Sequence, residues 1–581
     1  MIQEIGNKAR RFFHFAVYSL LPLTGGGWVG TSCSDMLQQD SDLVRFADDD
    51  MLTSATDTIY SVTGTMKKIQ ALADRTIILG EVRGDLVDVN NYASADLRQV
   101  ALFQSPNLSN KYNNPRDYYA VINNCNYFLA HADTALRNNQ NKRIFEKEYA
   151  VMKAYRAWCY FQLALIYGRV PFVTEPLLDT DVDESRFPLY DLQQVCQYFI
   201  SDLAPYANVP LPGYGSIGHV ESQLTYFPIH ILLGEFNLWA GNYREAAICY
   251  YCYISSRNGT NSAWPIGTLQ LQWTRDDGKY QRFTDTWSQP AFAAASERYT
   301  ADGELITMIP GDSIPTSPNY SSLPGLLNTN TQNDGYYSLT PSQAIVNLSA
   351  RQTYCNLTTT GDVGYAPKNL TEHRSGDLRL AAAWHLSPLS SLLSPLTTQT
   401  IEKYAYTTHV HLWRRAMVYL HMAEALNRAG MPEFAFRILS TGVNNRVIAE
   451  LQHTYPADSL WLGQFNFPNT EYVLRSDDPT GYNTIGMHSR GSGFTEHNEF
   501  YPMPTGTLEQ QIEQVEDLIV DEEALELAFE GQRFYDLMRV AFRRNDPSYL
   551  SSRIMTRRGS GVDSGIMVDL NNSQNWYLPL K

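Results

Sequence analysis

Residues 224–255 show the most regular pattern of apolar and polar positions in the chain. Apolar and small residues recur three and four positions apart, which is typical of the buried face of an α-helix. In the first half this face comprises Phe227, Ile231, Gly234 and Leu238. In the second half it comprises Ala246, Ala247, Tyr250 and Ile254. Gly241 and Asn242 interrupt the pattern as a helix C-cap would, so we predict a helical hairpin that needs neighbours to cover its apolar face.

The same arrangement recurs over residues 414–442. Four residues take the places of Gly234, Glu235, Gly241 and Ala246 at a constant offset: Ala423, Glu424, Gly430 and Ala435. A small residue followed at this interval by alanine is typical of tetratricopeptide repeats. Helical spacing also predicts helices over residues 48–74, 115–139, 142–168, 189–206 and 509–544. We therefore expect a mostly α fold, a superhelix of tetratricopeptide-like helix pairs.

Two stretches, residues 256–400 and 455–508, lose the helical spacing and are rich in glycine, proline, asparagine, serine and threonine. The first also contains many large aromatic residues, which disfavours disorder. We interpret both as ordered, loop-rich insertions on one helical body that spans residues 48–581.

The last helical stretch has its own pattern of charge. Glu526, Glu530 and Arg533 are three and four positions apart, so they are expected to form ladder pairs along one helix. Such pairs contribute only tenths of a kcal/mol when they are exposed. We interpret residues 530–533 as a structural hinge of the scaffold and not as a site.

The first 32 residues have the pattern of a bacterial export signal. Basic residues precede an apolar run of about twelve residues, which is too short to cross a bilayer. Thr31, Ser32 and Cys33 follow and are similar to a lipobox, although Gly30 stands where a leucine-like residue is usual. We expect a lipoprotein signal peptide over residues 1–32, lipidation of Cys33 and a tether over residues 33–47. The alternative is an ordinary cleaved signal with an incidental cysteine.

Charge and known motifs exclude several classes of function. The net charge of −16 disfavours nucleic acid as a partner. The spacing of Cys249 and Cys252 matches a redox motif but lies within a predicted helix, so we interpret the two as packing thiols. His409, His411 and His421 are better explained as structural than as metal ligands. The sequence predicts no metal, no cofactor and no catalytic residue.

Two loop regions combine aromatic, amide and charged residues in the way that sugar- and peptide-binding surfaces do. One lies between residues 81 and 92, and the other lies in the first insertion. The candidate ligand-binding residues are Arg83, Asp85, Asn91, Tyr92, Trp264, Trp273, Trp287, Tyr336 and Tyr337. Any one of these aromatic residues could equally belong to the core.

Four segments together resemble the SusD/RagB family of outer-membrane nutrient-binding lipoproteins of Bacteroidetes. They are the cysteine motif ending at Cys33, YRAWCYFQLALIYGRVPF at 155–172, RRAMVYLHMAEALNRAG at 414–430, and DEEALELAFEGQRFYDLMR at 521–539 with the terminal YLPL at 577–580. The resemblance implies four tetratricopeptide-like helix pairs that support a loop-rich lobe. It also implies a lipid anchor in the outer membrane, facing the cell exterior.

The same resemblance implies a function in nutrient uptake by binding and not by catalysis, so we expect a protein that is not an enzyme. Proteins of this family capture oligosaccharides, or in some members peptides, and pass them to a TonB-dependent transporter of the SusC kind. Three alternatives remain at this stage: a peptide ligand, a tetratricopeptide scaffold without a small ligand, and a secreted hydrolase.

Overall fold

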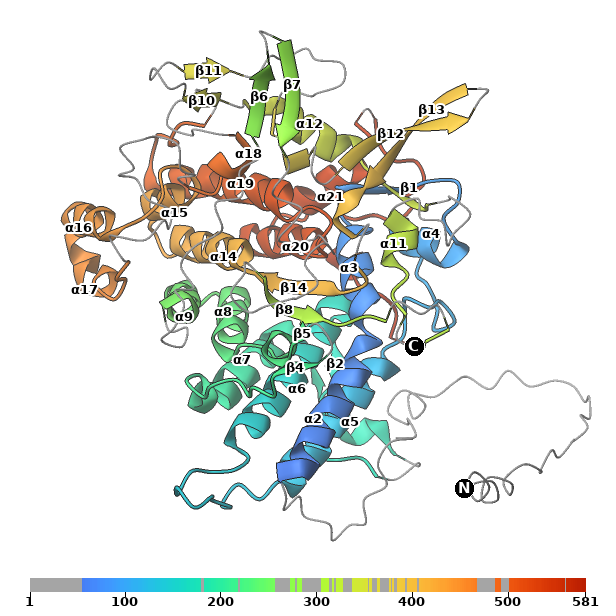
Figure 1. The fold of residues 1–581 in the computed structure, drawn as a ribbon, viewed down its shortest axis with the longest axis vertical. Coiled ribbons are helices and arrows are strands. Elements are labelled where there is room, and N and C mark those ends of the chain that lie inside the picture. The colour runs from blue at the N-terminus through green and yellow to red at the C-terminus, as the bar shows by residue number, and fades with distance from the viewer. Residues whose placement is uncertain are drawn as a thin grey trace, which may run out of the picture.

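The computed structural model describes residues 55–178, 182–217, 220–255, 272–276, 279–284, 305–312, 316–317, 320–327, 337–353, 355–357, 363–365, 376–377, 379–380, 384–391, 394–404, 407–467, 486–492, 501–559 and 561–580. Most of this part of the chain is helical, and successive helices pack side by side into a stack (Figure 1). The predicted mostly α fold is therefore confirmed. No helix among the described residues is both long and apolar enough to span a bilayer.

The first half of the stack contains α2 (Ala55–Gln70), α3 (Ala73–Glu81), α5 (Arg116–His131), α6 (Glu146–Tyr167) and α7 (Leu192–Leu203). The segment predicted as one helix near its start is divided between α2 and α3. Helix α6 is buried on nearly every side because α2, α5, α7 and α8 (Ile229–Ala240) surround it. At the start of α7, Asp191 and Gln194 form a capping box that satisfies two backbone N–H groups.

The predicted hairpin consists of α8 and α9 (Tyr243–Ser255), joined at Gly241, whose φ of 81° closes the first helix. On α9 the described buried residues are the four predicted: Ala246, Ala247, Tyr250 and Ile254. Helix α8 is buried more widely than its single predicted face because it lies between α7 and α9. A Cβ at Gly234 would lie 2.5 Å from the ring of Tyr250, so this position has room only for glycine.

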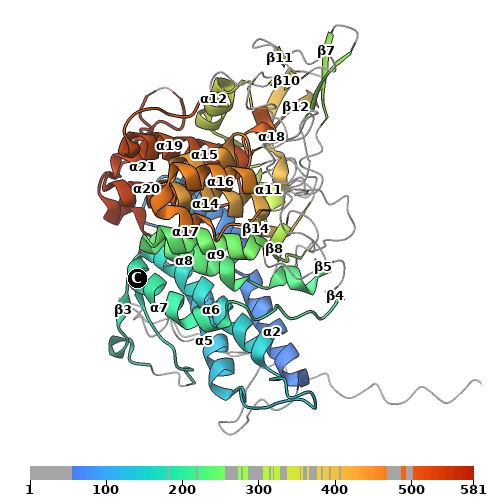
Figure 2. The same cartoon turned by 90° about the vertical axis from the view of Figure 1, so that its left-hand side faces the viewer.

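The second hairpin consists of α14 (Arg415–Arg428) and α15 (Pro432–Leu439). Helix α14 packs against α9, so the two related hairpins are neighbours in the stack (Figure 2). The predicted hairpin began at residue 414, which is the last residue of strand β14 (Val410–Arg414), and the helix starts one residue later. This strand pairs antiparallel with β8 (Leu305–Ile309), which joins the scaffold to the first insertion.

The closing stretch, predicted to be helical with a hinge at residues 530–533, is two helices, α19 (Leu508–Glu526) and α20 (Arg533–Arg544), followed by α21 (Ser548–Met555). The break lies at Phe529 and Gly531, which have φ values of 69° and 87°. The backbone of Gly531 lies against Gly80 of α3, where a Cβ on Gly80 would be 1.7 Å from the Gly531 carbonyl oxygen. The link between α19 and α20 therefore bends because it packs tightly against α3.

The described parts of the insertions are short strands and helices, as predicted. The paired strands are β6 (Gln272–Asp276) with β7 (Lys279–Thr284), β10 (Cys355–Leu357) with β11 (Val363–Tyr365), and β12 (Trp384–Ser391) with β13 (Ser394–Ile401). The helices are α11 (Leu323–Leu327), α12 (Gln343–Arg351), α17 (Ser459–Leu462) and α18 (Ser489–Ser492), and α16 (Asn445–Thr454) directly precedes the second insertion. Two further small ladders pair β2 (Val170–Pro171) with β3 (Leu189–Tyr190) and β4 (Ser216–Ile217) with β5 (Val220–Glu221). Strands β6, β7, β10 and β11 lie beyond α19 at one end of the stack (Figure 1).

Candidate ligand-binding surface and buried charge clusters

The two loop regions predicted to bind a ligand meet in a small β-ladder. Strand β1 (Val87–Val89) pairs antiparallel with β9 (Leu339–Pro341), with Val89 opposite Leu339. Directly beyond the ladder, the side-chain amide of Asn90 donates to the carbonyl oxygen of Tyr337 at 2.8 Å. Two segments that are some 250 positions apart in the chain thus lie side by side at the surface, with Ser338 donating to the carbonyl oxygen of Tyr92. The loop formed by residues 90–93 is called the Tyr92 loop below. Sequence alone identified both regions but not their pairing.

This loop is held in one conformation by its own hydrogen bonds. The Oδ1 atom of Asn90 accepts from the backbone N–H of Tyr92 at 2.9 Å, which forms an Asx turn. Arg98 of α4 (Ala95–Ala101) donates to the carbonyl oxygens of Asn90 and Ala93. Asn91 is exposed, and the side chain of Tyr92 is 62% exposed. A rigid loop therefore presents an aromatic face and an amide to solvent.

Arg83 does not reach this surface, contrary to the prediction. Its side chain is completely buried and lies 4.1 Å above the ring of Phe534. It donates to the carbonyl oxygens of Leu79 and Trp576 and to the hydroxyl of Tyr535. These contacts hold the C-terminal segment against α3, so Arg83 belongs to the scaffold.

Asp85 is also a scaffold residue in this structure. Its carboxylate forms a bidentate ion pair with Arg533 of α20, at 2.6 and 3.0 Å. Burial opposes the charge on Asp85, but the Arg533 guanidinium outweighs it and holds the pKa of Asp85 below its ordinary value. The predicted ladder pairs are corrected here too, because Arg533 pairs with this distant residue and not along its own helix.

The remaining predicted site residues fall into two groups. Tyr337 is partly exposed beside Asn90, and Trp273 lies on β6 opposite Phe283 of β7. The others lie outside the described residues: Cys33, Trp264, Trp287 and Tyr336. Ligand binding by the exposed members of the set stays a prediction.

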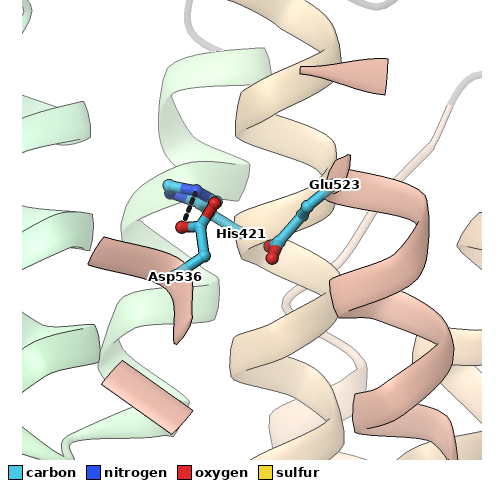
Figure 3. Close-up of side chains that lie close together, drawn as sticks. All are labelled: His421, Glu523 and Asp536. Carbon is cyan, nitrogen blue, oxygen red and sulfur yellow. Dashed lines mark ion pairs between the residues drawn. The ribbon is translucent and has the colours of Figure 1, made fainter. Parts of the chain in front are cut away.

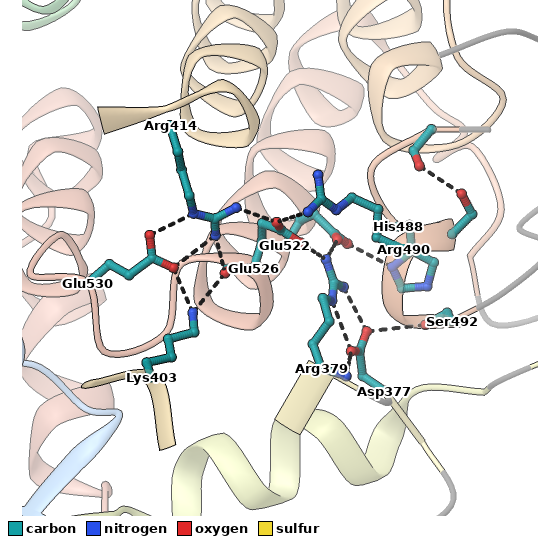
Figure 4. A network of polar contacts seen from close by, with 12 residues as sticks. Asp377, Arg379, Lys403, Arg414, His488, Arg490, Ser492, Glu522, Glu526 and Glu530 are labelled. Atoms are coloured by element: carbon teal, nitrogen blue, oxygen red, sulfur yellow. Dashed lines mark hydrogen bonds and ion pairs between the residues drawn. The ribbon is translucent and has the colours of Figure 1, made fainter. Parts of the chain in front are cut away.

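Beneath the insertions lies a buried network of charged residues (Figure 4). It joins four cationic and four acidic side chains, none more than 6% exposed: Arg379, Lys403, Arg414, Arg490, Asp377, Glu522, Glu526 and Glu530. Glu526 is at its centre and pairs with Arg379 at 2.8 Å, Arg414 at 2.7 Å and Arg490 at 3.2 Å. Burial opposes the charge of Glu526, but these arginines hold its pKa below the ordinary value.

The network ties the insertions to the scaffold. Asp377 and Arg379 come from the first insertion, Lys403 follows directly after it, and Arg490 comes from the second insertion. Arg414 at the end of β14 also holds Glu530 at 2.7 Å. The network contains as many cationic as acidic side chains. The sequence pattern predicted that Glu526 and Glu530 pair along their own helix, but their cationic partners come from four other segments.

A second buried cluster lies deeper in the stack, where His421 of α14, Glu523 of α19 and Asp536 of α20 converge (Figure 3). Each has a possible ligand atom within 4.8 Å of the others. His421 also pairs with Glu235 of α8 at 2.6 Å. Burial raises the pKa of Glu523 well above its ordinary value, and the nearby carboxylates of Asp536 and Glu424 raise it further.

The other sequence motifs keep their structural interpretation. Burial raises the pKa of the Cys249 thiol to about 12, so the thiol stays protonated at neutral pH. Burial lowers the pKa of His411 to about 3, and this imidazole stays neutral. Of the three histidines considered as metal ligands, only His421 belongs to the cluster described above.

The fold is a helical repeat with a loop-rich lobe, and comparisons with known proteins show what the chain is similar to. Residues 480–580 match the sequence model of the SusD family. A SusD superfamily protein from Bacteroides vulgatus has a similar structure, with a TM-score of 0.55 and 14% sequence identity over 91% of this chain and 96% of that chain. A SusD superfamily protein from Bacteroides thetaiotaomicron has a TM-score of 0.54 and 16% identity over 91% of this chain and 99% of that chain.

A third solved structure, a SusD-like carbohydrate binding protein from Bacteroides vulgatus, has a TM-score of 0.52 and 15% identity over 84% of each chain. No curated protein sequence matches the chain. The chain has the fold of the SusD superfamily, and its C-terminal part carries the sequence signature of that family. The predicted resemblance to the SusD/RagB family is thereby confirmed.

Proposed function

We propose that this protein captures an oligosaccharide at the cell surface and delivers it to a SusC-like TonB-dependent transporter. The observation that carries the proposal is the ordered loop at the β1–β9 ladder, which presents Asn91 and the 62% exposed Tyr92. The solved proteins with this fold include one described as a SusD-like carbohydrate binding protein, which supports a glycan as the ligand.

The loop suits a sugar for physical reasons. Sugar rings present apolar C–H faces, which pack on an aromatic ring, and hydroxyl groups, which an amide can bind. The Asx turn and the two hydrogen bonds from Arg98 fix the loop before a ligand arrives. Binding then orders few additional groups, and less affinity is lost to conformational entropy.

Capture and its location can be tested separately. Titration calorimetry of the purified protein against fragments of α-glucan, β-glucan, xylan, mannan and fructan, and against mixed tryptic peptides, identifies the ligand class. We expect saturable binding to one glycan class. Saturable binding to peptides alone would support the alternative, a peptide-binding protein of the same architecture, and no binding to either class would refute capture by the isolated protein.

Mutation of Tyr92 tests whether this loop is the site. Tyr92→Ala should weaken glycan binding about tenfold, because an aromatic residue at the centre of an interface contributes more than 1 kcal/mol. Tyr92→Phe retains the ring and should retain most of the affinity. Leu460→Ala, at an apolar residue that is 91% exposed on α17, is the matched control. Unchanged binding by Tyr92→Ala would place the site elsewhere.

We also propose that Cys33 carries the lipid anchor and that residues 1–32 are removed. Cys33→Ala should release the protein from the outer-membrane fraction into the soluble fraction, whereas Cys252→Ala, at a partly buried thiol, should not. Membrane retention of Cys33→Ala would refute lipidation at this residue. Co-purification of the anchored protein with a TonB-dependent barrel tests the proposed delivery partner.

A further inference from the structure

The cluster around Glu523 contains buried polar atoms that lack partners. The side chains of His421, Glu523 and Asp536 are at most 2% exposed. Neither carboxylate oxygen of Glu523 receives a hydrogen bond from any described residue, and neither does Nε2 of His421. Arg539 approaches one Glu523 oxygen only to 3.9 Å. A buried carboxylate without a partner costs several kcal/mol, so a site of this kind is expected to hold something.

The histidine is oriented as a ligand would be. Its Nδ1 atom lies 2.6 Å from a carboxylate oxygen of Glu235, and Glu235 is itself held by the hydroxyl of Tyr250 at 2.8 Å. With Nδ1–H donating to Glu235, the lone pair of Nε2 points to the cluster, 3.9 Å from Asp536. Histidines that bind metals commonly donate their other nitrogen to a carboxylate in this way.

The charges around the cluster do not balance. Four carboxylates surround it: Glu235, Glu424, Glu523 and Asp536. The cations that contact them are Arg539, which pairs with Glu424 at 2.6 Å and Asp536 at 2.9 Å, and Arg543, which pairs with Glu424. Arg543 is shared with Glu516. With all four carboxylates ionised and His421 neutral, the forms in which these side chains bind a metal, an excess of about two negative charges remains, which is the charge that one divalent cation supplies.

We propose that His421, Glu523 and Asp536 form a binding site for a divalent transition-metal ion of the Zn²⁺ type. One imidazole nitrogen and two carboxylates are a ligand set that such ions accept. Bond lengths of roughly 2.0–2.2 Å require ligand atoms closer together than 4.8 Å, so the Glu523 side chain must move inward. No hydrogen bond from a described residue holds its carboxylate back.

The ion would have a structural role. Its three ligands come from α14, α19 and α20, so it would connect the second helical hairpin with the two closing helices. The cluster is buried in the helical stack, whereas the Tyr92 loop is exposed and is formed by other segments of the chain. The proposed metal site therefore does not depend on the proposed glycan binding. It differs from the prediction, drawn from sequence, of no metal ligand.

Metal content and thermal stability together test this site. The purified full chain is unfolded in denaturant with a chelator, refolded with and without Zn²⁺, and dialysed. We expect about one tightly held equivalent of zinc by mass spectrometry and a Tm several degrees higher with zinc than without. Mn²⁺ in place of Zn²⁺ tests the preference of the ligand set.

Two variants make the test specific. Glu523→Gln removes a charge but no hydrogen bond, so the metal-free variant should fold and should neither retain zinc nor gain Tm from it. His453→Gln, at an exposed histidine of α16, should behave like the parent protein. Retention of less than about a tenth of an equivalent by the parent, or an equal response of Glu523→Gln, would overturn the proposal. The first result would assign the missing charge to protons.

Discussion

Helix α19 carries two buried glutamates, Glu523 and Glu526, in opposite electrostatic environments. Glu526 is completely buried and pairs with Arg379, Arg414 and Arg490. Glu523 is almost equally buried, yet both of its oxygens lack hydrogen bonds from described residues. The pKa of Glu526 lies below its ordinary value because the three arginines outweigh burial, whereas burial and nearby carboxylates raise that of Glu523.

The contrast shows that burial alone does not assign a role to an acidic residue. A balanced network costs desolvation energy but pairs each charge with an opposite one, so it serves to connect segments of the scaffold. A cluster that is equally buried but has more acidic than cationic side chains can still bind a cation. The predictions below test this difference, starting with the largest expected effect.

Glu526→Gln should destabilise the protein by about 3–5 kcal/mol, because three buried arginines lose their shared counter-ion. Urea unfolding followed by circular dichroism measures this loss. Glu513→Gln, at an exposed position of the same helix, is the control and should change stability by no more than about 0.5 kcal/mol. A loss for Glu526→Gln no larger than that of the control would show that the network is not a structural connection.

Glu81 lies at the border of the balanced network, and the dependence of protein stability on pH tests its environment. It accepts from the backbone N–H of Gly531 at 2.7 Å, and burial raises its pKa from 4.5 to about 7. Between these pH values the folded protein binds more protons at Glu81 than the unfolded protein, so the contribution of Glu81 to stability falls as pH rises from 4.5 to 7.

Glu81→Gln removes this titration. The free energy of unfolding of the variant relative to the parent should therefore rise by up to roughly 3 kcal/mol between pH 4.5 and pH 8, at 1.36 kcal/mol per pKa unit. Urea unfolding of both proteins at several pH values gives this difference directly, since groups that titrate in both proteins cancel. A difference that does not change with pH would contradict the raised pKa.

Gly234→Ala disturbs the outer support of the unbalanced cluster. The new methyl group would meet the ring of Tyr250, whose hydroxyl holds Glu235. We expect a loss of about 1–3 kcal/mol in thermal or urea unfolding. Gly64→Ala on α2 has no atom within 4 Å of the new methyl group and should instead stabilise the protein slightly. Equal effects of the two substitutions would argue against the tight contact between α8 and α9.

Glu523→Gln should have the smallest effect on the metal-free protein, about 1 kcal/mol or less and in the stabilising direction. It neutralises a charge in an anionic cluster and breaks no hydrogen bond to a described residue. Urea unfolding in the presence of a chelator provides the measurement. A loss as large as that of Glu526→Gln would mean that the two glutamates are equivalent, and the comparison would fail.

Sequence by itself determined the helical units of this protein. The spacing of apolar residues predicts the buried face of α9 residue for residue, because a helix repeats every 3.6 residues and needs only local information. Gly241 ends α8 as predicted, since its φ of 81° suits a residue without a Cβ. The exposed Asn91 and Tyr92 were also among the predicted site residues.

Only the tertiary structure decided which partners those residues meet. The pairing of β1 with β9 and the burial of Arg83 and Asp85 depend on segments hundreds of positions away. Glu523 and Glu526 differ for the same reason. Both residues lie on the same helix, but the charges that surround them come from other helices and from the insertions. Electrostatic energy depends on distance in space and not on distance along the chain.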